Sequence, residues 1–126
     1  MEILLDTNFI LACAKQKVDF VSWAEDNLGE VSWVVPDLVL AELEELSKRK
    51  GEKGKDKEAA NLGLQLLGRV KFQKIVLKGK DTDLAIRQFI EGKDIALATL
   101  DKGLKNKVKN KILTIKDVKG LEIILS

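Results

Sequence analysis

The chain has 126 residues, 45% of them hydrophobic and 33% charged, with a formal net charge of +2. This length predicts a single domain over residues 1–126 with enough apolar side chains to bury a core. Because the sequence holds no histidine, no tyrosine and one cysteine, a Ser-His-Asp triad, a histidine metal ligand, a cysteine-rich zinc site and an internal disulfide are excluded.

The apolar pattern alternates between short strand-like runs and longer helical ones. In chain order it predicts strand Ile3–Leu5, helices Phe9–Lys15 and Phe20–Asn27, strand Val31–Val35, a helix from Asp37 to about Lys50, helix Asp56–Gly68, strand Phe72–Leu77, helix Thr82–Glu91, strand Ile95–Thr99, helix 102–108, and strands Ile112–Ile115 and Leu121–Leu125. Gly29 is expected to end the second helix, Asp56 to cap the fourth, and Asp81, with Thr82 as the alternative, to cap the fifth. This alternation predicts an α/β three-layer sandwich, in which a mostly parallel, twisted sheet of four or five strands has helices on both faces.

Three aspartates stand where the predicted strands end or a helix begins. Asp6 follows the first strand, Asp101 follows the strand that ends at Thr99, and Asp83 lies in the first turn of its helix. Sites in open α/β sheets form beyond the carboxyl ends of the strands, so these side chains are expected to converge there. Each also has a structural alternative, because Asp6 and Asp101 suit helix caps and Asp83 suits the positive end of a helix dipole.

A fourth carboxylate belongs to the helix that starts at Asp37. Glu42 and Glu45 share one flank of this helix, whereas Glu44 is rotated away from them. The spacing does not decide between residues 42 and 45, and solvated surface glutamates are the alternative for both. Clustered carboxylates repel one another unless a cation neutralises them, and hard divalent cations prefer oxygen ligands. The leading hypothesis is therefore a metal-dependent phosphoryl-transfer site.

Two segments are rich in basic side chains. Residues 48–57 hold six basic and two acidic side chains, and residues 102–111 hold five lysines and no acid. Such segments suit a polyanion, although a solvated lysine-rich surface is the alternative. Trp23 and Trp33 are candidates for stacking on bases, but their apolar neighbours favour a place in the core.

The sequence also predicts a cytoplasmic protein without membrane contact. The longest apolar run, Phe9–Ala14, is too short to cross a bilayer. No basic segment precedes the first apolar run, so no secretory signal is visible. The lone Cys13 fits a reducing compartment.

Four acidic motifs are spread along nearly the whole chain. They are Asp6-Thr7-Asn8 after the first strand, Val35-Pro36 leading into Leu40-Ala41-Glu42-Leu43, Thr82-Asp83-Leu84-Ala85-Ile86, and Ala98-Thr99-Leu100-Asp101. Each motif alone is a weak signal, but the ordered set resembles the PIN-domain nucleases. One departure is Leu100, because many members of that family carry asparagine directly before the last aspartate.

The resemblance implies a set of site residues and a cofactor. It implies catalytic, metal-binding roles for Asp6, Glu42, Asp83 and Asp101, with Mg²⁺ or Mn²⁺ as the cofactor. It selects Glu42 over Glu45 and Asp83 over Asp81. Supporting roles then fall to Thr7, Asn8, Asp81 and Thr99. The residues expected to hold RNA phosphates are Lys48, Arg49, Lys50, Lys53, Lys102, Lys105 and Lys107.

The function implied by the resemblance is metal-dependent hydrolysis of single-stranded RNA. The segment Arg49–Leu67 resembles that of archaeal and eukaryotic PIN nucleases linked to ribosomal RNA processing. A toxin-type ribonuclease of a toxin–antitoxin pair and a catalytically weak RNA- or ribosome-binding module are the alternatives. The expected partners are RNA, a second copy of the chain, and an antitoxin or a ribosome-assembly protein. A phosphotransfer receiver domain fits less well, because it requires an aspartate after a central strand and Asp56 follows a loop. A haloacid-dehalogenase-type phosphatase fits less well, because it requires an aspartate where Asn8 stands.

Overall fold

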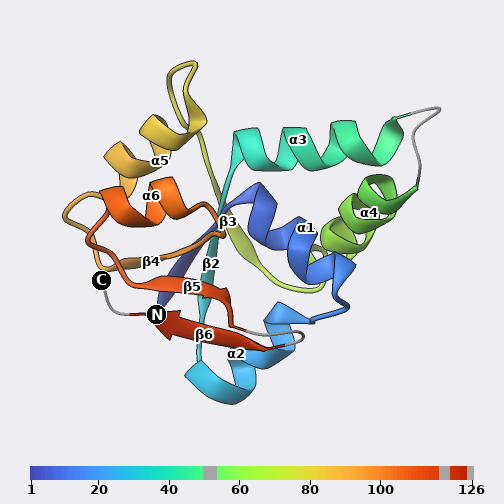
Figure 1. The fold of residues 1–126 in the computed structure, drawn as a ribbon, viewed down its shortest axis with the longest axis horizontal. Coiled ribbons are helices and arrows are strands. Elements are labelled where there is room, and N and C mark those ends of the chain that lie inside the picture. Colours follow the sequence, from blue (N-terminus) through green and yellow to red (C-terminus); the bar gives the residue numbers. More distant parts are fainter. Residues whose placement is uncertain (50–53, 117–119, 125–126) are drawn as a thin grey trace.

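The computed structural model describes residues 1–49, 54–116 and 120–124. Over these residues a central sheet lies between two layers of helices, as the sequence predicts (Figure 1). The elements are β1 (Glu2–Leu5), α1 (Thr7–Lys15), α2 (Phe20–Leu28), β2 (Ser32–Pro36), α3 (Asp37–Lys48), α4 (Lys55–Leu67), β3 (Phe72–Ile75), α5 (Thr82–Ile90), β4 (Ile95–Ala98), α6 (Lys102–Lys107), β5 (Ile112–Ile115) and β6 (Leu121–Ile124).

The sheet is mostly parallel, and its strand order creates a crevice at the carboxyl end of β1. Within the described residues there are six strands in the order β3-β2-β1-β4-β5-β6, one more than the upper expectation of five. The first five are parallel, and only β6 runs antiparallel, against β5. The order reverses between β1 and β4, and such a switch point is where ligands bind in open α/β sheets.

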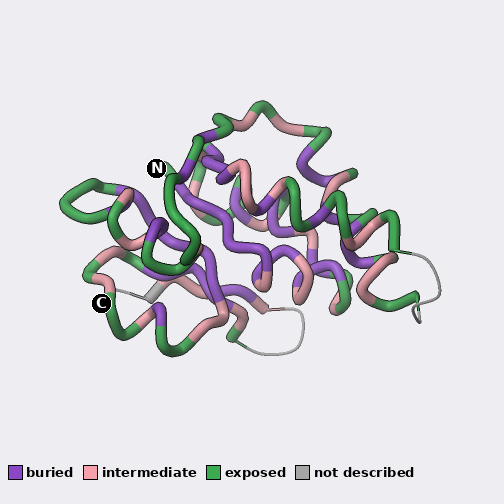
Figure 2. Tube along the Cα trace, turned by 90° about the horizontal axis from the view of Figure 1, so that it is seen from above, coloured by how far each residue is buried: buried purple, intermediate pink, exposed green. Residues whose placement is uncertain are grey.

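The apolar side chains of the central strands alternate between two cores. Ile3 and Leu5 face the layer formed by α1 to α4, whereas Leu4 and Leu97 face α5 and α6. The strands are therefore buried on both sides, which explains why their sequences read as continuous apolar runs. Figure 2 shows the buried residues running through the middle of the molecule. Burying each large side chain stabilises the fold by roughly 1.5–3 kcal/mol.

The two tryptophans belong to the larger core, as their apolar neighbours predicted. Trp33 is buried and meets the ring of Phe20 edge-on, with 5.5 Å between the ring centres. Trp23 is partly buried against the same cluster. Because Trp33 is enclosed by protein, its ring is not available for stacking on a base.

Most predicted boundaries lie within one residue of the structure, and three differ by two residues. Helix α1 begins at Thr7, not Phe9, because Asp6 caps it. Gly54, not Asp56, caps α4, and Asp56 lies in the first helical turn, where its carboxylate pairs with Lys15. An acidic group in that turn still complements the helix dipole, so the residue type indicated the helix start to within two positions. Strand β3 ends at Ile75. The expected ends at Lys50 and Leu125 lie outside the described residues.

Two other helix boundaries are confirmed. Gly29 ends α2 with a φ of 77°, and Asp81 caps α5. In the described ranges, no helix is both long and apolar enough to cross a bilayer.

The packing of α4 on α1 generates a stability prediction. A Cβ added at Gly63 would lie 2.5 Å from Cγ2 of Ile10, which is fully buried. Gly63→Ala should therefore lower the free energy of unfolding by roughly 1–2 kcal/mol, because overpacking outweighs the better helix propensity of alanine.

Gly68→Ala is the matched control, because Gly68 has a helical backbone and its added Cβ meets ordinary contacts at 3.4 Å. Urea unfolding of both variants measures the difference. A Gly63→Ala variant as stable as Gly68→Ala would contradict the close approach of the two helices.

Candidate active site

Asp6 is a buried carboxylate at the carboxyl end of the central strand. Its backbone N–H continues the sheet by donating to the carbonyl of Ala98 at 3.0 Å, so the residue is fixed beside the end of β4. Its Oδ1 accepts a 2.9 Å hydrogen bond from the N–H of Thr7. The side chain thus both caps α1 and remains at the switch point of the sheet, and only 6% of the residue is exposed.

Thr99 joins the segments that follow β1 and β4. Its hydroxyl donates to Oδ2 of Asp6 at 2.8 Å and lies 3.3 Å from Oδ1 of Asn8. The same oxygen accepts from the N–H of Asp101 at 3.1 Å, and Thr99 has no exposed surface. Oδ1 of Asn8 also accepts from the N–H of Leu100 at 3.0 Å. These bonds fix Asp6 and Asp101 in relation to each other.

Thr7 connects Asp6 to Glu42 on α3. The Thr7 hydroxyl donates to Oε2 of Glu42 at 3.1 Å. Glu45 is the alternative that the spacing left open. Its Oε1 instead lies 3.6 Å from Nη2 of Arg49, the residue that ends α3. The structure therefore brings residue 42, not residue 45, to the edge of the sheet where Asp6 lies.

Asp83 approaches this edge from the other layer of helices. Asp81 and Asp101 cap α5 and α6, and accept from Leu84 N–H at 3.2 Å and Leu104 N–H at 3.1 Å. Together with Asp83, they line a pocket of about 200 Å³. Both roles considered for Asp101 are thus present, because one carboxylate caps a helix and faces the pocket.

Burial and neighbouring carboxylates disturb the ionisation of Asp6 and Asp83. Burial raises the pKa of Asp6, and the charges of Asp83 and Glu42 raise it further, against the hydrogen bonds from Thr99 and Thr7. Partial desolvation raises the pKa of Asp83, as do the neighbouring Asp101 and Asp81, while Lys107 acts in the opposite direction. The four segments therefore share one electrostatic environment, in which negative charge accumulates at an energetic cost.

The oxygen-only donor set fits a hard cation such as Mg²⁺. Within the described residues, however, no three acidic, histidine or cysteine side chains are arranged to hold one ion together. Mg²⁺ keeps several waters and takes one or two direct carboxylates, so this arrangement suits binding through few protein ligands. Asp6, Asp83 and Asp101 are the candidates for these few direct ligands, with Glu42 beside them, and the described geometry does not place all three around one point.

The basic residues expected to contact RNA are spread more widely than the carboxylates. Lys102 and Lys107 are exposed on α6, and Lys107 lines the acidic pocket. The ammonium group of Lys105 instead donates a hydrogen bond to Oγ1 of Thr114 at 2.8 Å. Lys48 lies about 9 Å along the axis of α3 beyond Glu42, and Arg49 is the residue that ends this helix. Lys50 and Lys53 fall outside the described residues.

Sequence reasoning missed four residues that line the acidic pocket, which are Leu84, Arg87, Gly103 and Leu104. Arg87 stands four residues after Asp83, so a shared helix face was the available signal. Leu84 is a large apolar side chain that is 42% exposed, which the sequence pattern did not indicate.

The raised pKa of Asp6 predicts a pH dependence of stability. The native protein holds this proton at a pH where the unfolded chain has lost it, so the free energy of unfolding falls as pH rises above about 4. In metal-free buffer, Asp6→Asn should therefore be more stable than the parent at pH 7 and lose less stability between about pH 4 and 7.

The side-chain oxygen of an asparagine at position 6 can still accept from the N–H of Thr7, and its NH₂ group can donate to the hydroxyl of Thr99. Asp26→Asn, on an exposed part of α2, is the matched control. Urea unfolding across this pH range measures the effect. Equal pH dependence in Asp6→Asn and the parent would show that Asp6 carries no such cost.

Comparison with known proteins agrees with this geometry. A family model described as a PIN like domain matches residues 3–120. Ribonuclease VapC4 of Methanocaldococcus jannaschii is 32% identical over 128 residues, covering 97% of this chain and 95% of that protein.

Solved structures show the same fold. The PIN domain endonuclease Utp24 matches with a TM-score of 0.77 and 25% identity, covering 99% of this chain and 92% of that one. A chain of VapBC2 from Rickettsia felis, bound to a DNA fragment from their promoter, matches with a TM-score of 0.61 and 18% identity, covering 90% of this chain and 98% of that one. The resemblance seen in the four acidic motifs is therefore confirmed, and the chain belongs to the PIN-domain family.

Proposed function

We propose that this protein is a metal-dependent endoribonuclease that hydrolyses RNA phosphodiester bonds with Mg²⁺ or Mn²⁺. The observation that carries the proposal is the linkage of Asp6, Glu42 and Asp101 through Thr7 and Thr99, with Asp83 close enough to raise the pKa of Asp6. Membership in the PIN-domain family and the similarity to ribonuclease VapC4 and the endonuclease Utp24 support it.

The proposed roles follow from how each side chain is held. A divalent cation bound here would acidify a water molecule and neutralise charge on the phosphate. Asp6, Asp83 and Asp101 supply the oxygens for it, and Thr7 and Thr99 keep Asp6 and Glu42 in fixed orientations. Such chemistry needs no histidine, in agreement with the composition.

The substrate is proposed to be single-stranded RNA. Lys102 and Lys107 on α6 are exposed near the carboxylates and suit contacts with backbone phosphates. Contacts with the same phosphates stay a prediction for five other basic residues, which are Lys48, Arg49, Lys50, Lys53 and Lys105. Association into a homodimer also stays a prediction.

Two cellular roles suit this activity. The first is processing of ribosomal RNA with a ribosome-assembly partner, which the resemblance of Arg49–Leu67 favours, and the TM-score of 0.77 to the PIN domain endonuclease Utp24 supports the endonuclease activity that this role requires. The second is a toxin-type ribonuclease with an antitoxin partner, and the 32% identity to ribonuclease VapC4 supports the ribonuclease activity that this role requires. Induced expression in a heterologous host separates them, because only the toxin-type role predicts growth arrest that Asp83→Asn relieves.

Substitution of the carboxylates should remove RNA cleavage. Asp83→Asn is expected to lower the single-turnover rate on a fluorescent single-stranded RNA with Mn²⁺ by about a hundredfold or more, because the cation loses a direct ligand. Glu42→Gln should lower the same rate by about tenfold, since its charge acts beside the cation.

Glu45→Gln is the matched control for Glu42→Gln, because both glutamates are exposed on α3 but only Glu42 bonds to Thr7. Thermal unfolding confirms that each variant is folded. Equal rates for Glu42→Gln and Glu45→Gln would remove Glu42 from the site. Saturable Mn²⁺ binding without any cleavage by the parent would favour the RNA-binding module instead.

A further inference from the structure

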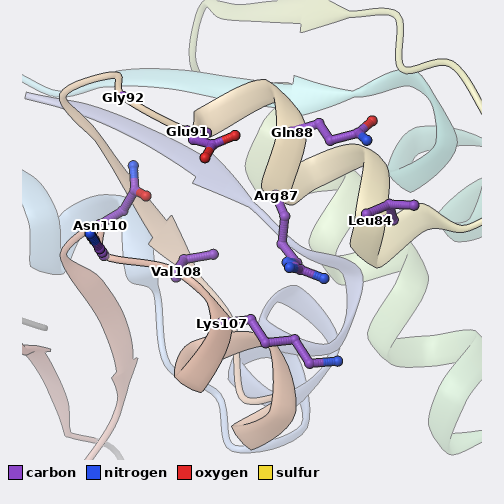
Figure 3. Close-up of a pocket in the computed structure, with 9 residues that line it drawn as sticks. Leu84, Arg87, Gln88, Glu91, Gly92, Lys107, Val108 and Asn110 are labelled. Atoms are coloured by element: carbon purple, nitrogen blue, oxygen red, sulfur yellow. The ribbon is translucent and has the colours of Figure 1, made fainter.

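A second pocket lies next to the acidic one along the outer side of α5. It has a volume of about 390 Å³, within the range of about 300–1,000 Å³ typical of small-ligand sites. Figure 3 shows it between α5 and the segment that follows α6. Leu84, Arg87 and Lys107 line both pockets, so the two lie side by side. An RNA strand bound at the carboxylates can therefore place its next nucleotide in this second pocket.

The end of the second pocket nearest the carboxylates is basic. Arg87 comes from α5 and Lys107 from α6, and Figure 3 shows the guanidinium of Arg87 extending toward Lys107. Nε of Arg87 is buried and has no hydrogen-bond partner among the described residues. Leaving a buried donor unsatisfied is costly, so a shift of the Arg87 side chain that turns this N–H toward an acceptor in the pocket would be favourable. Glu91, the pocket's carboxylate, lies toward the opposite end, where it does not compete for an anion beside Arg87.

The walls of the second pocket are fixed and partly apolar. Nδ2 of Asn110 lies 3.1, 3.1 and 2.8 Å from the carbonyl oxygens of Ile90, Lys93 and Ile95, which anchors the segment after α6 to the end of α5. Leu84 and Val108 add apolar surface beside the basic groups. An anion seat next to an apolar wall suits a nucleotide better than a free inorganic ion, because a sugar and base would cover the aliphatic side chains.

We propose that this pocket binds the RNA nucleotide adjacent to the scissile phosphate, with Arg87 and Lys107 holding its phosphate and Leu84 and Val108 contacting its sugar and base. Arg87 would form the forked pair of hydrogen bonds that a guanidinium makes with phosphate oxygens, and a shift of its side chain would let Nε join them. This inference rests on the proposed nuclease function, in that it assigns a second subsite to the same substrate.

The direct test is a titration without metal, which is independent of cleavage. Adenosine 5′-monophosphate, adenosine and inorganic phosphate are each added while NMR follows the Leu84 and Val108 methyl groups and Nε–H of Arg87. The nucleotide should move all three sets of signals. Loss of a charge-assisted pair predicts about tenfold weaker nucleotide binding in Arg87→Gln and in Lys107→Gln.

Arg69→Gln is the matched control, because it removes the same charge from an exposed position after α4. It should bind the nucleotide as the parent does. Unchanged affinity in both Arg87→Gln and Lys107→Gln, or signals that move only elsewhere, would overturn the subsite. Adenosine binding as tightly as the nucleotide would overturn the role of the phosphate contacts.

A cleavage assay then tests the subsite against the nuclease proposal. The ratio of kcat/KM for single-stranded RNA to that for bis(p-nitrophenyl) phosphate, which lacks a neighbouring nucleotide, should fall about tenfold in Arg87→Gln, mainly through KM. The ratio should not change in Arg69→Gln. An unchanged ratio in Arg87→Gln would contradict the subsite. A parent that binds the nucleotide as expected but cleaves neither substrate would refute the nuclease and leave the binding pocket standing.

Discussion

The site depends on a carboxylate buried between the ends of two parallel strands. Asp6 follows β1, and its side chain is held from β4 by the hydroxyl of Thr99 at 2.8 Å. Burying a charged group is unfavourable unless hydrogen bonds or a counterion compensate for it. The bonds from Thr7 and Thr99 compensate only in part, because the pKa of Asp6 stays raised. A cation bound beside Asp6 would offset the remaining cost of burying its charge.

The same constraint explains how distant segments meet. Because β1 and β4 are parallel neighbours, Asp6 and Thr99 emerge at the same edge of the sheet. Thr7 then extends the network to Glu42 on the layer of α1 to α4, and Asp83 arrives from the layer of α5 and α6. Each face of the sheet thus contributes one side of the site. Negative charge is concentrated between the layers, and the basic groups of Arg87 and Lys107 lie directly beside it.

Much of this arrangement was predictable from local sequence, and the rest required tertiary contacts. The positions of Asp6 and Asp101 follow from the ends of apolar strands, and parallel pairing places them at one edge. Glu42 and Glu45 are equivalent by helical spacing, and the family resemblance selected Glu42; in the structure it is the hydroxyl of Thr7, 35 residues away, that distinguishes them. Arg87 was not identified, because its relevance depends on a segment after α6 that packs beside it. The cap of α4 was misassigned at Asp56, since first-turn and capping positions favour the same residue types.

The central claim is that these carboxylates share a divalent cation, and crystals soaked in Mn²⁺ test it most directly through the anomalous signal of the metal. The account predicts a peak among the side-chain oxygens of Asp6, Asp83 and Asp101, with water completing the coordination. Side chains of Asp83 and Asp101 should turn toward the ion. Saturating Mn²⁺ with no peak at this edge of the sheet, or a peak only on surface carboxylates elsewhere, would contradict the account.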